Sequence, residues 1–206
     1  MTSTDIELAA PAPLRDSAVD AAMSMLGAVE RLNGELIEEG NPPIAVGIGV
    51  HTGRLMLGTI GGRQRLDCTV IGDPANLASR IEGMTKVYGA RLLISEATLA
   101  GILDAERYLL REVDRVRAKG KREPITVYEV LDAQLDGAKV RTKAAFERGL
   151  QAYREADFET ALNLFGACVQ QAPDDVAATL YIRRSEHYVA SGVPASWSGI
   201  TDMTTK

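Results

Sequence analysis

Apolar residues along this chain follow two spacings, and each spacing predicts a different kind of element. Short β-prone runs bounded by glycine and polar turns predict strands over residues 44–50, 54–60, 66–71, 108–116 and 125–130. Apolar residues three and four apart predict helices instead. The first such helix covers about Leu14 to Glu39, and its apolar stripe consists of Leu14, Ala18, Ala22, Met25, Val29, Leu32 and Leu36.

A second helix is expected to begin at Pro74, directly after the third β-prone run. Asp73 is a good N-cap because its carboxylate accepts hydrogen bonds from the free N–H groups of the first turn. Proline suits the first helical position because it has no N–H group to satisfy. The buried stripe of this helix is predicted to be Leu77, Ile81, Met84 and Tyr88.

Two glycines interrupt the first β-prone run, at Gly47 and Gly49. Glycine weakens a strand, so its presence there indicates that another backbone or a ligand approaches closely.

Asn76 and Arg80 lie four residues apart and share one face of the second helix, beside its buried stripe. An amide can hydrogen-bond a sugar hydroxyl, and a guanidinium stays charged and offers several fixed donors to phosphate oxygens. The pair therefore suits a nucleotide. The alternative is an ordinary solvated helix face, because such pairs are common on helices.

The residues around this pair form an ordered motif, which consists of Arg65, Asp67, Thr69 to Asp73, Asn76 and Arg80. The motif resembles the second half of the catalytic domain of class III adenylate and guanylate cyclases. The resemblance continues through Leu92–Ser95, Arg115–Lys121 and Val127–Val130, and it covers roughly residues 14 to 131. It implies an α+β fold, a partial class III cyclase domain with a ferredoxin-like βαβ sheet and helices.

The resemblance also implies an activity, the conversion of ATP to cyclic AMP and pyrophosphate in intracellular signalling. By this resemblance Asn76 positions the ribose, and Arg80 stabilises charge on the phosphates in the transition state. Lys119 matches the lysine that family members aim at the triphosphate, with Lys121 as the fallback if the turn is shifted. Viewed without the family, the two lysines are a basic turn between two strands.

Thr69 falls where the threonine-bearing bacterial subclass reads the adenine amino group. Guanylate cyclases often carry cysteine at that position, and Cys68 is the neighbouring residue, so a slip of one residue would change the base that is read. The gap-free spacing from Gly72 to Asn76 favours Thr69 and ATP. Guanylate cyclase activity remains the alternative.

The family's metal ligands, two aspartates on early strands that hold Mg²⁺ or Mn²⁺, have no counterpart here. Only thirteen residues precede Leu14, and residues 1–13 have the composition of a linker. Asp5 and Glu7 are acidic, but the Asp-x-x-x-Phe-Thr motif and the second Gly-Asp motif are absent. We therefore expect an N-terminally truncated domain without metal ligands, inactive as an isolated chain.

Class III sites form between two catalytic domains, so the resemblance implies a homodimer or a heterodimer with another cyclase domain that supplies the metal ligands. Two hypotheses from other classes stand beside this one. The first is a catalytically silent regulatory module that pairs with a complete cyclase. The second is a protein-interaction module whose C-terminal part is the functional one.

After residue 133 the pattern changes to helices. Residues 134–139 have the composition of a linker, and Ala144 to Ala177 fit a single tetratricopeptide-like hairpin. The repeat's small, aromatic and terminating positions are filled by Gly149, Tyr153, Phe158, Ala161, Phe165 and Pro173. An ordinary helical hairpin is the alternative. One repeat cannot bury its own face, so a third helix over about 175–190, or the cyclase part, is expected to cover it.

These observations divide the chain into a cyclase part over 14–133, an all-α segment over 140–190 and a tail over 191–206, with a possible protein partner for the helical segment.

The net charge of −5 argues against a nucleic-acid surface. No apolar run approaches the roughly 20 residues of a membrane span. Two cysteines without a paired framework fit a cytoplasmic protein, and His51 and His187 are too isolated to hold a metal.

Overall fold

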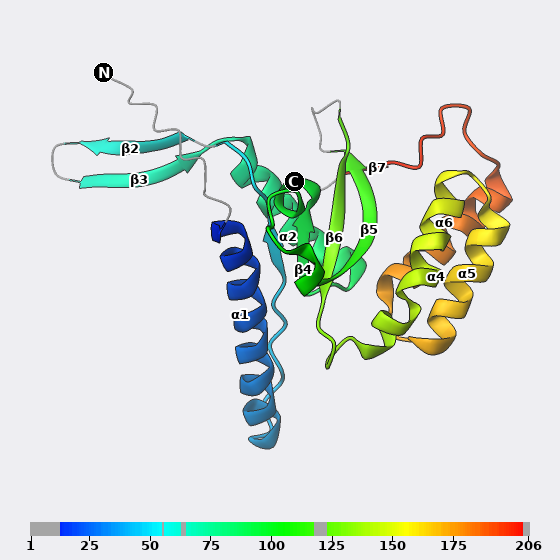
Figure 1. Cartoon of the computed structure of the whole chain (residues 1–206), viewed down its shortest axis with the longest axis horizontal. Coiled ribbons are helices and arrows are strands. Elements are labelled where there is room, and N and C mark those ends of the chain that lie inside the picture. The colour runs from blue at the N-terminus through cyan, green and yellow to red at the C-terminus, as the bar shows by residue number, and fades with distance from the viewer. Residues whose placement is uncertain (1–12, 55, 63–64, 118–122, 204–206) are drawn as a thin grey trace.

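The computed structural model describes residues 13–54, 56–62, 65–117 and 123–203, with backbone alone for residues 13–14 and for the two strands between 56 and 71. A five-stranded sheet carries helices on both faces, and a two-stranded hairpin projects from it (Figure 1). The mixture of strands and helices confirms the predicted α+β fold. The described helices include none that is long and apolar enough to cross a membrane.

The five strands lie in the order β1 (Ile48–Val50), β4 (Leu92–Ser95), β6 (Ile125–Leu131), β5 (Leu109–Arg117) and β7 (Thr201–Asp202). The two outer pairs are parallel, and the inner pairs, β4 with β6 and β6 with β5, are antiparallel. A short helix α3 (Glu96–Leu99) and the 3₁₀ turn η1 (Ala105–Arg107) connect β4 to β5. The last strand therefore extends the sheet with a segment from the C-terminal tail.

Alternate residues of the central strands serve opposite faces of the sheet. Leu92 and Ile94 of β4 pack with helix α1 (Pro13–Glu38) on one face. Leu93, between them, packs on the other face with helix α2 (Asp73–Tyr88). All four residues of β4 are buried, because helices cover both faces of the sheet at this interior strand.

The predicted apolar stripe of α1 is only partly right. Val19 and Ala22 are buried against the sheet, and Met23 and Leu26 pack beside them. Met25, in contrast, is 59% exposed. The helix is longer than the sheet that it covers and extends past it (Figure 1), so only one side of its N-terminal half meets the sheet.

The first strand is shorter than predicted, because residues 44–47 are not part of the sheet. The backbone N–H group of Ile44 donates to Asn33 Oδ1 (2.7 Å), and its carbonyl oxygen accepts from Asn33 Nδ2 (3.0 Å). Both polar backbone groups of Ile44 are thus used by a side chain of α1 instead of a neighbouring strand.

Strands β2 (Met56–Gly62) and β3 (Arg65–Ile71) form an antiparallel hairpin, which leads into α2. The sequence predicted both strands but not their pairing with each other. The start of α2 differs from the prediction by one residue. Asp73 is the first helical residue, and Gly72 occupies the N-cap position without a side-chain cap hydrogen bond. The carboxylate of Asp73 therefore lies inside the first turn, where the helix dipole favours a negative charge.

Three helices follow the sheet, α4 (Gly137–Arg154), α5 (Phe158–Gln171) and α6 (Val176–Ser191). Helix α4 begins within the segment predicted to be a linker. The expected third helix is present, and Asp175 is its N-cap, with Oδ1 accepting from Ala178 N at 3.3 Å. Membership of the tetratricopeptide family stays a prediction.

Aromatic side chains join these helices to each other and to the sheet. A Cβ atom on Gly149 of α4 would lie 2.9 Å from the ring of Phe165 on α5, so the missing side chain allows the two helices to pack closely. Edge-to-face and stacked ring contacts connect Phe146, Tyr153, Phe158, Phe165, Tyr181, Tyr188 and Trp197. This cluster is continuous with residues of α2 and the sheet in one hydrophobic core.

A buried charge network ties the helices to the sheet at one edge of this core. Arg111 of β5 is completely buried and donates to Glu129 Oε2 of β6 from Nε (3.0 Å) and to Asp175 Oδ2 from Nη1 (2.5 Å). Its guanidinium also lies 4.3 Å from the centre of the Phe146 ring. Lys139 of α4 donates to Glu129 Oε1 at 2.7 Å. The network therefore joins four elements, β5, β6, α4 and the start of α6.

We predict that Arg111→Met lowers the free energy of unfolding by about 3–5 kcal/mol, because it leaves buried carboxylates without their guanidinium. Urea denaturation followed by circular dichroism measures this loss. Arg107→Met is the matched control, since its ion pair with Asp20 is exposed and is worth at most about 1 kcal/mol. Equal effects of the two substitutions would contradict the role given to Arg111.

Candidate functional site

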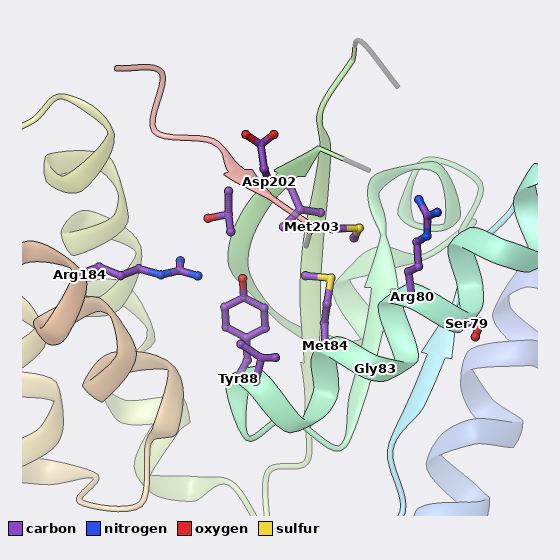
Figure 2. Close-up of a pocket in the computed structure, with 11 residues that line it drawn as sticks. Ser79, Arg80, Gly83, Met84, Tyr88, Arg184, Asp202 and Met203 are labelled. Atoms are coloured by element: carbon purple, nitrogen blue, oxygen red, sulfur yellow. The ribbon is translucent and has the colours of Figure 1, made fainter. Parts of the chain in front are cut away.

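The two predicted catalytic side chains lie together on α2. Asn76 is exposed and Arg80 is half-buried, one helical turn further along. Figure 2 shows the Arg80 side chain extending away from the axis of α2. Within the described part of the chain, neither side chain has a hydrogen-bond or ion-pair partner. The amide and the guanidinium are therefore available to bind a ligand or another protein.

The other predicted site residues are less completely described. Thr69 lies on β3 and pairs with Gly58 across the hairpin, and Cys68 pairs with Thr59. The description of this strand extends to its backbone only. Lys119 and Lys121 lie in residues 118–122, which are outside the described residues, as are Asp5 and Glu7. The structure thus brings Asn76 and Arg80 together and leaves the placement of the remaining groups as a prediction.

Close backbone contact holds α2 against β1. A Cβ atom on Gly49 would lie 2.3 Å from Glu82 N and 2.7 Å from Ala78 O, so only glycine fits between this strand and the helix. A Cβ atom on Gly47 would clash with the side chain of Thr85. Both glycines therefore serve the close approach that the sequence predicted, and the partner is the backbone and side chains of α2.

The C-terminal end of α2 is anchored by a buried hydrogen-bond relay. The hydroxyl group of Tyr88 donates to Asp114 Oδ2 on β5, and Arg184 Nη1 on α6 donates to the same oxygen at 3.0 Å. Burial and the nearby Asp114 carboxylate raise the pKa of Tyr88, so this tyrosine stays protonated and keeps its donor. The relay connects the helix that carries Arg80 to the C-terminal helices.

The turn after β1 supports the other end of α2. A Cβ atom on Gly53 would lie 2.6 Å from the ring of Pro74, so the turn packs directly on the first residues of the helix. His51 is half-buried, and its Nδ1 lies 2.7 Å from Ser95 Oγ. Burial lowers the pKa of His51. The ring of His51 is thus used in a hydrogen bond to the end of β4, which is a structural role.

The described residues do not form a site that fits a catalytic metal. Among them, no three His, Cys, Asp or Glu side chains converge closely enough to hold an ion. Carboxylate oxygens are the ligands that Mg²⁺ and Mn²⁺ prefer. Asp114, which bonds to Tyr88 at the end of α2, and Asp202 are each bonded to an arginine. A divalent cation is therefore not assigned to any described residue.

A pocket of about 270 Å³ opens beside Arg80. Its walls come from α2, β5, α6 and β7, and Figure 2 shows Tyr88 and Met84 rising into it from α2 with Arg184 reaching in from α6. Asp202 and Met203 close it from the side of the tail. We call this space the α2–α6 pocket.

Sequence reasoning missed the long-range partners of α2. Tyr88 was assigned to the buried stripe, which its 1% exposure confirms, but its bond to Asp114 was not foreseen. The available signal was the charge pattern of β5, where Arg111 and Asp114 interrupt an otherwise apolar buried side. A charged residue at an inward strand position requires a partner. The sequence does not say that the partners of these two residues lie on α6 and at its N-cap.

Comparison with known proteins places this geometry in context. The family model for the adenylate and guanylate cyclase catalytic domain matches residues 10–131. An adenylate cyclase of Anabaena cylindrica is 45% identical over 120 residues, which cover 56% of this chain and 24% of that protein. The terminal-differentiation-specific adenylate cyclase of Dictyostelium discoideum is 33% identical over 145 residues, covering 68% and 7% respectively.

A solved structure is similar as well. The crystal structure of the adenylyl cyclase CyaB from P. aeruginosa superposes with a TM-score of 0.50 at 27% identity, covering 59% of this chain and 61% of that chain. The chain spans about a quarter or less of the length of the two curated relatives. Helices α4 to α6 and strand β7 lie beyond the residues that the family model matches.

We predict that Gly49→Ala lowers the free energy of unfolding by about 1–3 kcal/mol, because the new methyl group pushes β1 away from the backbone of α2. Gly83→Ala on α2 is the control, since a Cβ atom there meets nothing within 4 Å and alanine stabilises a helix by roughly 0.5–1 kcal/mol over glycine. Urea denaturation measures both. An unchanged free energy of unfolding in Gly49→Ala would contradict the close contact between β1 and α2.

Proposed function

This chain belongs to the adenylate and guanylate cyclase catalytic domain family, and we propose that it supplies one side of a composite site that converts ATP to cyclic AMP and pyrophosphate. In this proposal Asn76 and Arg80 are the catalytic residues, and Thr69, Asn76 and Lys119 bind the substrate. The observation that carries it is the pair Asn76 and Arg80, which have no partner among the described residues and lie on a firmly held helix.

The chemistry of the reaction explains what these groups do. The ribose 3′ hydroxyl attacks the α-phosphorus of ATP, the bond to the β-phosphate oxygen breaks, and pyrophosphate leaves with the electron pair. Negative charge builds on the phosphate oxygens as the bond breaks, and the guanidinium of Arg80 stabilises that charge because it remains protonated. The amide of Asn76 orients the ribose through hydrogen bonds.

The positions of Thr69 and Lys119 complete the nucleotide side of the site. Thr69 reads the adenine amino group, and β3 leads from it to α2 through Gly72. Lys119 approaches the triphosphate from the turn between β5 and β6. These assignments rest on the ordered family motif, and their side chains are not described in the structure.

The remaining half of the site comes from a partner in this proposal. Cyclases of this family use Mg²⁺ or Mn²⁺, and the described residues form no ligand set for either ion. A second cyclase domain that carries the metal-binding aspartates, in a homodimer or a heterodimer, would complete the site. Rigid support of α2 favours such an arrangement, because a composite site requires each half to be formed before the halves meet.

A catalytically silent regulatory module is the second candidate. The observation that favours it is the relay from Tyr88 through Asp114 to Arg184, which links α2 to helices outside the cyclase match. In that case the chain would pair with a complete cyclase and change its rate without contributing Arg80 to the reaction. Guanylate cyclase activity is the alternative for the substrate, since Cys68 adjoins Thr69.

We predict that the purified chain alone forms no detectable cyclic AMP from ATP and Mn²⁺. Adding a cyclase domain that lacks its own asparagine and arginine but keeps its aspartates restores formation of cyclic AMP, with ATP preferred over GTP. Arg80→Ala reduces the restored rate by about 10²–10³-fold, as expected for a group that stabilises transition-state charge. Chromatographic quantification of cyclic nucleotides measures each rate.

Lys86→Ala is the matched control, because it removes one positive charge from the exposed surface of the same helix without changing Arg80. It should leave the restored rate within about twofold, since the interactions of an exposed charge are weak in water and are screened further by salt. Sedimentation confirms that the two domains associate. Association without restored activity would overturn the composite site and favour the silent module.

A further inference from the structure

We propose that the α2–α6 pocket binds a small organic anion with a flat apolar body. The pocket residues that the proposal uses are Arg80, Gly83, Met84, Tyr88, Arg184 and Met203. The volume of about 270 Å³ lies just below the roughly 300–1,000 Å³ that is usual for ligand sites, so it suits a small molecule of few fused or linked rings. This proposal does not rest on the cyclase activity.

The charged side chains around the pocket leave one positive charge that an anion would balance. Arg184 is compensated by Asp114, whose Oδ2 accepts from Nη1 at 3.0 Å. Asp202 is compensated by Arg117, which donates to both carboxylate oxygens at 2.7 and 3.1 Å. Arg80 has no such partner in the described part of the chain. The two compensated pairs cancel, so the described residues that line the pocket carry one unbalanced positive charge.

The rest of the lining suits an apolar ring system. Tyr88 and Val116 are almost completely buried and form the inner wall, and Met84 is 8% exposed beside them. Met203 closes the opposite wall from the tail, where its backbone N–H donates to Arg117 O at 2.9 Å. Methionine side chains are flexible and polarisable, so two of them adapt readily to the faces of a flat ring. A simple inorganic anion would leave this apolar surface uncovered.

The pocket is a property of this chain and not of the cyclase domain alone. Its walls from α6 and β7 lie beyond residues 10–131, which the family model matches. A ligand bound here therefore contacts both α2 and the C-terminal segment. If the proposed function also holds, the ligand engages the guanidinium that would otherwise meet the phosphates, and its binding would oppose cyclase activity.

A binding experiment with a fluorescent probe tests the pocket directly. The probe is anilinonaphthalene sulfonate, which has a flat apolar body and one negative charge, and its neutral counterpart is phenylnaphthylamine, which lacks the sulfonate. We expect the full chain to bind one sulfonate probe per molecule in a saturable way, at least tenfold more tightly than the neutral probe. Arg80→Gln should remove most of this difference.

Gly83→Leu blocks the pocket without disturbing the helix, because a Cβ atom at Gly83 meets nothing within 4 Å and leucine favours helical structure. It should weaken probe binding at least tenfold. Gly166→Leu is the matched control, since Gly166 on α5 has equally open surroundings and does not line this pocket. Circular dichroism and the urea midpoint confirm that both variants are folded.

The outcomes separate the proposal from its alternatives. Binding that Gly83→Leu leaves unchanged would overturn the pocket as the binding site. Equal affinity for the charged and neutral probes would overturn the anion requirement. Loss of binding in Gly166→Leu as well would show that the probe reports a general change of the surface, which also overturns the proposal. None of these readouts requires cyclase activity, so failure here and failure of the proposed function are distinguishable.

Discussion

The complete burial of Arg111 constrains how the helical segment sits on the sheet. A guanidinium without access to water must have its hydrogen bonds satisfied by protein groups, and here Glu129 and Asp175 supply them. Asp175 also caps α6, so the same residue begins this helix and pairs with the buried charge of Arg111 on β5. Breaking this arrangement would leave buried charges unpaired, and the helices are therefore held to one position on the sheet.

The position of the helical segment matters because it packs in the same core as α2, the helix that carries Asn76 and Arg80. Tyr88, near the end of α2, bonds to Asp114 of β5, and Arg184 of α6 bonds to the same carboxylate. Nearer the middle of α2, the absence of a side chain on Gly49 allows the strand to touch the helix backbone. Asn76 and Arg80 thus project from a helix whose rotation is restricted at two points. Their orientation depends on residues far from any nucleotide.

Local patterns in the sequence predicted most of the helices and strands. They did not predict which side chains of different elements contact each other. The runs that form β2, β3, β5 and β6, and the second helix with its stripe, follow from spacing alone, whereas β4 and β7 were not among the predicted strands. Gly49 correctly indicated a close backbone approach. The face of α1 was partly wrong, because the sheet covers only part of the helix and leaves Met25 exposed. The bond between Asp114 and Arg184 joins residues 70 positions apart. Burial shows that Asp114 needs a partner, but only the folded chain shows which arginine provides it.

Arg80 combines three properties that set it apart from other arginines around this core. It is charged, it is half-buried, and it has no partner in the described residues, although arginines 111, 117 and 184 around the same core are each paired with a carboxylate. A solvated guanidinium loses little by remaining unpaired at a pocket edge, and it gains when an anion arrives. A phosphate from a nucleotide and an organic anion in the α2–α6 pocket both satisfy that condition. The phosphate and the organic anion cannot both bind the guanidinium fully at the same time. Binding of either one therefore weakens binding of the other, by the same factor in both directions.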